Sequence, residues 1–248
     1  MSEINVLTKP QIQQTMHRIG KHYVCTDIHG NLARYQQMME HINTCDHLYI
    51  LGDVIDRGIA GIDILKDIMT RDNVTLLLGN HEEMMLQSLH YKDEDAHLNW
   101  VQLCNGGGIT EYMWNQEDPV VQDDILQYLI SCNISYQLQV NETNYILCHS
   151  GTLPGITTLP YQNATAEQKD IILWYSPFRK DLHVSLEYYD LQYRYIIGHV
   201  PVQKMGQDTI VTIDNITDID CGCAYTNCPD QTSLALLCLE DLSCQYFQ

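Results

Sequence analysis

Three short polar clusters, each placed directly after an apolar run, constrain this chain more than any other feature. They read Asp-Ile-His-Gly at 27–30, Gly-Asp-Val-Ile-Asp-Arg-Gly at 52–58 and Gly-Asn-His-Glu at 79–82. Two histidines follow the same pattern downstream, His149 after Ile-Leu-Cys and His199 after Ile-Ile-Gly. Side chains with carboxylate, imidazole and carboxamide groups can bind divalent metal ions in sites that contain no thiolate ligand. Their recurrence along one chain predicts a dinuclear metal site.

The apolar runs alternate with segments of helical spacing, which predicts an α/β fold. Strand-like runs lie at 23–26, 48–51 and 74–78, and helical spacing covers 32–42, 59–69 and the segment from Glu82 onward. This order, with right-handed crossovers, predicts adjacent parallel strands. Each polar cluster would then lie at the carboxyl end of a strand, where open α/β sheets form their ligand crevices.

The rest of the chain is predicted to be helical first and mainly β afterwards. Residues 93–130 read as mainly helical, with a break at Asn-Gly-Gly-Gly 105–108 that we expect to form a turn near the cleft, and Pro119 opens a helix near 120–130. Strand runs return at 135–140, 145–148, 193–197, 209–213 and 233–239, and 152–165 is expected to be a surface loop. No linker divides the chain, so we expect one domain over residues 1–248 with one sizeable core.

The charge balance limits the partners of the protein. The chain carries 32 acidic against 13 basic residues, a formal net charge of −19. Such a chain repels phosphate polymers and anionic lipid surfaces, so we exclude a general nucleic-acid or membrane binder. The Lys and Arg residues are few and scattered, so any basic site must be small.

Ten cysteines raise the question of disulfides. The first residues show no basic and apolar secretory pattern, and no run reaches the length of a membrane span. We therefore expect a cytoplasmic protein with reduced cysteines. Cys221, Cys223 and Cys228 lack a second thiolate pair at zinc spacing, so we interpret them as free thiols.

Six side chains of the clusters could act as metal ligands: Asp27, His29, Asp53, Asn80, His149 and His199. Asp27 and His29 are two residues apart, so both can point the same way from an extended segment. Asp53 can bridge two cations with its two oxygens. Mixed oxygen and nitrogen ligands suit Mn²⁺, Fe or Zn²⁺. Two such ions about 3.5–4 Å apart activate a water and clamp both oxygens of an in-line displacement.

Neighbouring residues supply the remaining parts of a phosphoryl-transfer site. His81 follows Asn80 directly, and because adjacent side chains diverge it can serve as a general acid. Asp56 is the natural carboxylate to hold its tautomer. Arg57 offers a planar fork for two phosphoryl oxygens, and a second Arg would complete the clamp.

The clusters resemble those of the phosphoprotein phosphatase family within the binuclear metallophosphoesterases, over about residues 22–240. The resemblance implies a calcineurin-like catalytic domain, a β-sandwich of mixed sheets flanked by helices around a βαβαβ metal-binding core. It also implies one metal on Asp27, His29 and Asp53, a second on Asp53, Asn80, His149 and His199, and phosphate binding by Arg57 and Asn80. By the same resemblance a metal-bridging hydroxide attacks phosphorus without a phosphoenzyme, and His81 paired with Asp56 protonates the leaving group. We expect two divalent ions, Mn²⁺ first, with Fe or Zn²⁺ as alternatives.

The tail at 219–225, leading to 234–236, resembles the closing segment of the bacterial branch of this family. That branch includes the bacteriophage lambda phosphatase and the symmetrical diadenosine tetraphosphate hydrolases. The family's second phosphate-binding Arg usually follows a Trp closely. Here Arg179 lies five residues after Trp174, and we assign it this role with Arg194 as the alternative.

Three functions remain open. The first is a Ser/Thr phosphoprotein phosphatase acting on phosphorylated proteins or small phosphoesters, which the pairing of Asp56 with Arg57 favours within the family. The second is hydrolysis of dinucleoside polyphosphates at the same site, since some bacterial members with this pair cleave dinucleotides. The third is a non-catalytic scaffold, which is disfavoured because every ligand and acid is kept. We expect specificity to depend on the loops at 93–118, 152–165 and 175–192.

Overall fold

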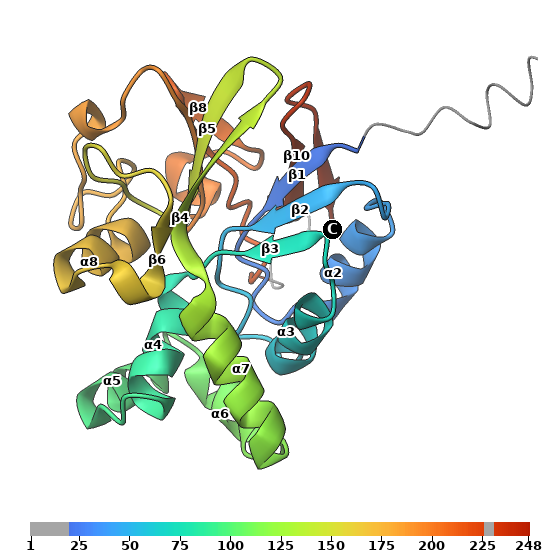
Figure 1. The fold of residues 1–248 in the computed structure, drawn as a ribbon, viewed down its shortest axis with the longest axis vertical. Coiled ribbons are helices and arrows are strands. Elements are labelled where there is room, and N and C mark those ends of the chain that lie inside the picture. Colours follow the sequence, from blue (N-terminus) through green and yellow to red (C-terminus); the bar gives the residue numbers. More distant parts are fainter. Residues whose placement is uncertain (1–19, 226–230) are drawn as a thin grey trace, which may run out of the picture.

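The structure, a computed structural model, describes residues 20–225 and 231–248. Within these residues the strands form two sheets with helices around them (Figure 1). One sheet has five strands in the order β11-β10-β1-β2-β3, namely β1 (His22–Cys25), β2 (His47–Ile50), β3 (Val74–Leu76), β10 (Leu234–Cys238) and β11 (Cys244–Phe247). The other has six in the order β6-β4-β5-β7-β9-β8, namely β4 (Asn133–Val140), β5 (Thr143–Cys148), β6 (Leu159–Pro160), β7 (Arg194–Ile197), β8 (Val211–Ile213) and β9 (Ile216–Asp218).

The two sheets pack against each other through one of two large hydrophobic cores. Consecutive side chains of a strand point to opposite faces, so in β1 Val24 packs between the sheets while Tyr23 and Cys25 pack beneath the helices. The core between the sheets consists of Val24, Tyr49, Leu51, Leu77, Val140, Tyr145, Leu147, Ile196, Ile219, Leu237 and Leu239. Strands buried on both faces explain why the sequence shows continuous apolar runs there.

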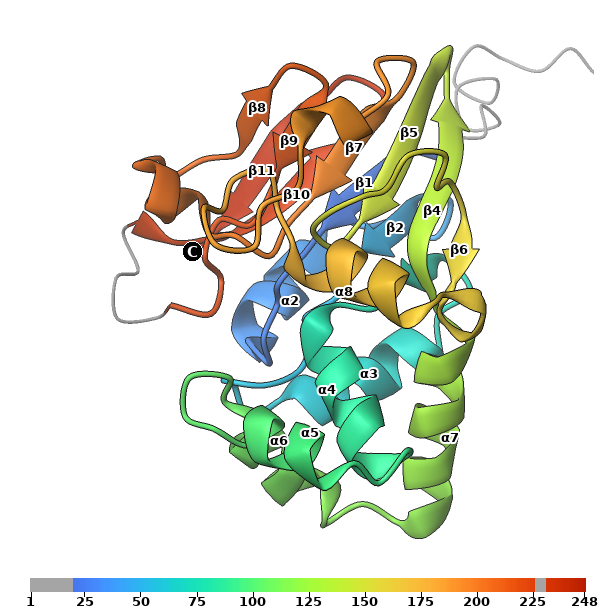
Figure 2. The same cartoon turned by 90° about the vertical axis from the view of Figure 1, so that its left-hand side faces the viewer.

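The α-helices lie outside the sandwich and bury their apolar sides in the second core. In the described residues they are α2 (Leu32–Met39), α3 (Gly61–Met69), α4 (Asn80–Leu89), α5 (Glu94–Trp100), α6 (Gly107–Trp114), α7 (Pro119–Ser131) and α8 (Ala166–Trp174). Short 3-10 turns cover Tyr161–Asn163, Leu186–Tyr188 and Val202–Met205. Figure 2 shows α4–α7 grouped at one end of the sheets, with α8 between them and the six-stranded sheet.

The predicted parallel strands and the placement of the polar clusters are confirmed. β1, β2 and β3 are parallel neighbours, with Val24 opposite Tyr49 and Tyr49 opposite Thr75, and β5 and β7 are parallel in the second sheet. Each polar cluster begins within four residues of the carboxyl end of its strand. The layered α/β fold implied by the family resemblance is also confirmed.

Several elements differ from the sequence prediction. The pattern gave no sign of α8, because its fully buried residues Ile172 and Leu173 are adjacent rather than spaced by three or four. It also missed β6, β9 and β11; β11 is an edge strand whose middle residues are exposed, so it has little apolar signal. α4 begins at Asn80 rather than at Glu82, which places Asn80 and His81 in the first helical turn.

The cysteine prediction is confirmed as far as the structure extends. The nine described cysteines are all free thiols, and those at 221 and 223 are buried, while Cys228 lies outside the described residues. Within the described ranges no helix is long and apolar enough to cross a membrane.

Candidate metal centre and active site

The loops that follow the strands hold the site in a strained backbone conformation. Six of the ten non-glycine residues with positive φ in the described chain lie in the polar clusters: Asp27, His29, Asp53, Asp56, Arg57 and His199. Such conformations cost about 1–3 kcal/mol each and persist only where surrounding contacts enforce them. Their concentration here marks the strand ends as the functional edge of the molecule.

One buried carboxylate enforces part of this geometry. Glu82 accepts hydrogen bonds from the backbone N–H groups of Asp53 at 2.8 Å, Val54 at 2.8 Å and Gly79 at 2.9 Å. It therefore ties the loop after β2 to the start of α4. Glu82 had no predicted role, because its N-cap residue Gly79 has no side chain and therefore supplies only half of a capping box.

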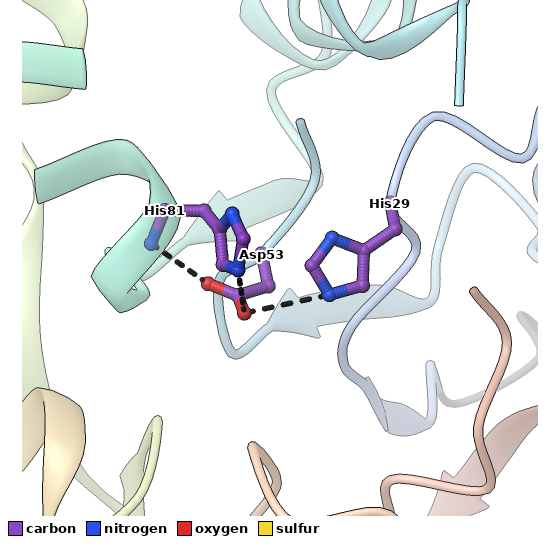
Figure 3. Close-up of side chains that lie close together, drawn as sticks. All are labelled: His29, Asp53 and His81. Atoms are coloured by element: carbon purple, nitrogen blue, oxygen red, sulfur yellow. Dashed lines mark hydrogen bonds and ion pairs between the residues drawn. The ribbon is translucent and has the colours of Figure 1, made fainter. Parts of the chain in front are cut away.

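Asp53 lies at the centre of the site, as Figure 3 shows. Its Oδ2 is 3.5 Å from Nε2 of His29, and its Oδ1 is 3.5 Å from Nε2 of His149. The backbone N–H of His81 donates to Oδ1 at 3.1 Å. The two oxygens of Asp53 thus face two different histidines, which is the arrangement that a bridging carboxylate needs.

Backbone carbonyls orient these histidines. His29 donates from Nδ1 to the carbonyl of Ile55 at 2.9 Å, and His149 donates from Nδ1 to the carbonyl of Leu51 at 2.7 Å. In both rings the Nε2 lone pair is then left facing Asp53. Burial lowers the pKa of His29 well below its usual range, which favours the neutral, metal-binding form.

Asn80 and His199 complete a second group of donors. Oδ1 of Asn80 is 2.9 Å from Nε2 of His149 and 3.0 Å from Nδ1 of His199. Asp27 lies beside the first group, with Oδ1 3.7 Å from Nε2 of His29, while its Oδ2 accepts from the backbone N–H of His199 at 3.0 Å. All six residues that the sequence proposed as ligands are therefore brought together.

The donor atoms fit two divalent cations. Two compact groups share Asp53: His29, Asp53 and His81, and Asp53, His149 and His199. Neutral imidazoles and a carboxylate with no thiolate match the hard and borderline ions that the sequence indicated. His81 joins the first group by position, although the sequence assigned it as an acid rather than a ligand.

His81 is held by Asp56. Its Nδ1 lies 2.6 Å from Oδ2 of Asp56, and Trp100 donates from Nε1 to the same oxygen at 2.9 Å. Burial raises the pKa of Asp56 to about 7, opposed by hydrogen bonds from Thr110 and Trp100, and burial lowers the pKa of His81. Burial thus disfavours the charged form of both partners, and their hydrogen bond offsets part of that cost. Trp100 lies on α5, and no sequence signal linked it to the site.

Arg57 points into the site. Its Nη1 lies 2.7 Å from Nε2 of His29 and its Nη2 lies 3.3 Å from Nε2 of His81. The backbone of Arg57 packs on Gly106, directly before α6, where a Cβ on Gly106 would come within 2.9 Å of the nitrogen of Arg57. The predicted turn extends only to Gly106, because Gly107 and Gly108 begin α6, and it contacts a candidate phosphate-binding residue directly.

The two candidates for the second arginine lie at opposite ends of the sheet. Nη1 of Arg179 is 3.3 Å from Nε2 of His199, and its guanidinium also pairs with Asp181. Arg194 begins β7, whereas His199 follows the other end of that strand. The geometry therefore brings Arg179 to the site and leaves Arg194 away from it.

A sandwich of two mixed sheets that presents carboxylates, imidazoles and a carboxamide at its strand ends defines the class of metallophosphoesterases. The calcineurin-like phosphoesterase family matches residues 21–222, most of the chain. The protein belongs to this family.

Two curated relatives carry different activities in their names. The chain is 27% identical over 212 residues to serine/threonine-protein phosphatase 2 of Escherichia coli, covering 83% of this chain and 89% of that protein. It is also 27% identical over 154 residues to the symmetrical bis(5'-nucleosyl)-tetraphosphatase of Nitrosomonas europaea, covering 60% of this chain. The match spans about half of the Nitrosomonas protein, 52% of its length.

Solved structures show the same fold at low identity. A protein serine/threonine phosphatase from Saccharomyces cerevisiae superposes with a TM-score of 0.62 and 13% identity, over 95% of this chain and 82% of that chain. A cold-active protein-tyrosine phosphatase of a psychrophilic Shewanella gives a TM-score of 0.58 and 18% identity, over 93% of this chain and 81% of that chain. These similarities support the fold and leave the substrate open.

Proposed function

We propose that this protein is a metal-dependent Ser/Thr phosphoprotein phosphatase. The hydrogen bond between His81 and Asp56 is the observation that carries the proposal. A serine or threonine alkoxide is a strongly basic leaving group that needs a proton in the transition state, whereas the phosphate released from an anhydride needs much less help. General acid catalysis contributes about 10²–10⁴-fold to such reactions. A buried, carboxylate-held imidazole therefore supports alcohol phosphomonoesters as substrates.

Six residues of the site would bind the metal ions. Asp27, His29, Asp53, Asn80, His149 and His199 would hold the two ions, with Mn²⁺ as our first choice. Bound divalent ions would activate the attacking water for direct in-line displacement and polarise the phosphoryl group.

The phosphate would lie between two guanidinium groups. Arg57 and Arg179 would orient the phosphoryl oxygens, together with Asn80. Asp56 at Nδ1 would stabilise the imidazolium form of His81, whose Nε2 would pass its proton to the departing oxygen and leave a neutral imidazole. We also infer that residues 1–248 form one catalytic domain and that the protein is cytoplasmic.

Leaving-group dependence tests this proposal. His81→Asn should lower kcat for a phosphoserine peptide by about 10²–10³-fold, and by much less for p-nitrophenyl phosphate, whose leaving group needs little protonation. Equal losses with both substrates would refute the role of His81 as the acid. The assay uses purified protein with Mn²⁺, and retained metal binding shows that the variant is folded.

Hydrolysis of dinucleoside polyphosphates is the second candidate, favoured by the similarity to the Nitrosomonas tetraphosphatase. Phosphopeptide and diadenosine tetraphosphate assayed side by side with Mn²⁺ separate the two. Turnover of the dinucleotide alone would refute the phosphoprotein assignment. Absence of turnover with any phosphoester would instead support a non-catalytic scaffold.

A further inference from the structure

A cavity of about 380 Å³ opens beside the candidate metal centre, between α4, α5 and α8. Its walls include Glu83, Met84 and Gln87 from α4, and Lys169, Asp170 and Trp174 from α8. Figure 2 shows α8 lying next to α4 on the same side of the molecule. None of these side chains has a part in the proposed chemistry.

The cavity begins one helical turn from a candidate metal ligand. Glu83 and Met84 follow Asn80 by three and four residues on α4, so their Cβ atoms lie about 5–6 Å from that of Asn80. On the other wall, the ring of Trp174 is 6.2 Å from the ring of His199, centroid to centroid. The cavity therefore lies within about one side-chain length of the candidate metal ligands Asn80 and His199.

The walls carry excess negative charge. The half-buried Glu83 accepts a hydrogen bond from the indole of Trp174, and Lys169 is close enough to favour its charged form. The ammonium of Lys169 also lies 3.5 Å above the ring of Tyr161, so this single cation is shared between the ring and Glu83. The exposed Asp170 adds a second carboxylate at the rim. Two carboxylates against one ammonium leave a site for a positively charged group.

We propose that this cavity binds the Lys or Arg side chain of a protein substrate that lies one or two residues from the phosphorylated Ser or Thr. This inference rests on the proposed phosphatase function. An extended peptide advances about 3.3 Å per residue, so such a side chain can reach Glu83 while the phosphate stays at the metals. Its aliphatic stem would pack on Met84 and Trp174.

Long-range charge favours the same class of substrate. The net charge of −19 attracts basic peptides and repels polyanionic nucleotides. A nucleobase would bring no positive charge to Glu83 and Asp170, so it would leave both carboxylates uncompensated. A basic phosphopeptide therefore fits this cavity better than a dinucleotide.

Six phosphoserine peptides test the proposal with the full chain and Mn²⁺. They form two sets of three, which carry Arg, Ala or Glu two residues before the phosphoserine or two residues after it. We expect kcat/KM to fall in the order Arg, Ala, Glu, with at least a fivefold advantage of Arg over Ala that resides in KM and shrinks in 0.5 M salt. Glu83→Gln should reduce this advantage to less than twofold and leave p-nitrophenyl phosphate turnover unchanged. Glu167→Gln makes the same charge change at an exposed position of α8 outside the cavity, and should keep the preference.

Asp170→Asn, at the exposed rim, provides a second variant with little risk to folding, and should lower the Arg advantage two- to threefold. Equal kcat/KM for the Arg and Ala peptides would overturn the inference and leave the phosphatase function standing. A preference that persists in both variants would also overturn it. Hydrolysis of diadenosine tetraphosphate with no turnover of any phosphopeptide would overturn the proposed function as well.

Discussion

Replacing Glu82 with Gln tests how the strained loop after β2 is held in place. Oε2 of Glu82 accepts from the N–H groups of Asp53 and Gly79, and Oε1 accepts from those of Val54 and Ile55. A glutamine keeps one acceptor oxygen and turns an NH₂ group toward the remaining donors. Whichever oxygen is replaced, two buried backbone N–H groups lose their acceptor, and the loop that carries Asp53 loses part of its support.

The size of the effect follows from these contacts. Hydrogen bonds to a charged acceptor contribute about 1.5–3 kcal/mol each, so losing two costs about 3–6 kcal/mol. Burial raises the pKa of Glu82, which shows that its charge is itself costly to bury, and the neutral amide recovers part of the loss. We expect a net loss of about 2–4 kcal/mol in the free energy of unfolding. For a chain of this size that lowers Tm by about 4–16 °C.

Thermal unfolding in chelator and Mn²⁺ titration by calorimetry measure the two consequences. Glu82→Gln should lower Tm by that amount and weaken Mn²⁺ binding, because Asp53 is no longer fixed between His29 and His149. Glu83→Gln is the matched control, since it makes the same change one residue away, where the carboxylate bonds to an indole instead of to the backbone of the loop. If both variants unfolded and bound Mn²⁺ like the unmodified protein, the proposed role of Glu82 would be refuted.

Two further predictions concern the buried carboxyl group of Asp56 and the positive-φ turn at Gly52. Burial raises the pKa of Asp56 from 3.8 to about 7, so the folded protein holds a proton that the unfolded chain releases, and stability falls as pH rises from about 4 to 7. In chelator, Asp56→Asn should remove up to about 4 kcal/mol of the loss in stability between pH 4 and 7, and parallel pH–stability curves would contradict it. Gly52 has φ +91° and a Cβ there would lie 2.1 Å from the nitrogen of Gly79, so Gly52→Ala should cost at least about 2 kcal/mol and weaken metal binding. Gly155→Ala, with φ +77° and nothing within 4 Å, is the control that shares the φ penalty alone, and an equal cost in urea unfolding would refute the contact argument.

The parts of the fold that the sequence could predict depend on local pattern. Three apolar runs, each followed by a polar cluster, were enough to place β1, β2 and β3 side by side and their loops at one edge, because parallel strands joined by helices leave few other arrangements. α8 and β11 could not be found this way. The adjacent buried pair of Ile172 and Leu173 gives no helical period, and an edge strand has no alternating apolar face.

The residues of the candidate site also fall into those that the sequence could predict and those that only the structure identifies. Residues within the clusters, such as Asp53 and His149, could be named from the sequence because their chemistry and position are visible there. Trp100 donates to Asp56 across 44 residues of sequence, and only the packing of α5 brings it there. The choice of Arg179 over Arg194 also required the structure, since both follow Trp174 in the sequence. Only Arg179 reaches His199 at the carboxyl end of the strands, whereas Arg194 begins β7.

Counting bound metal in the unmodified protein and in Asp53→Asn tests the central claim most directly. Elemental analysis after Mn²⁺ loading should find two ions per chain in the unmodified protein, because Asp53 presents one oxygen to His29 and the other to His149. The Asn variant has one uncharged amide oxygen at this position instead of two carboxylate oxygens. It should keep at most one ion and lose hydrolysis of p-nitrophenyl phosphate. One ion or none in the unmodified protein, or two ions with full activity in the variant, would contradict a dinuclear site bridged by Asp53.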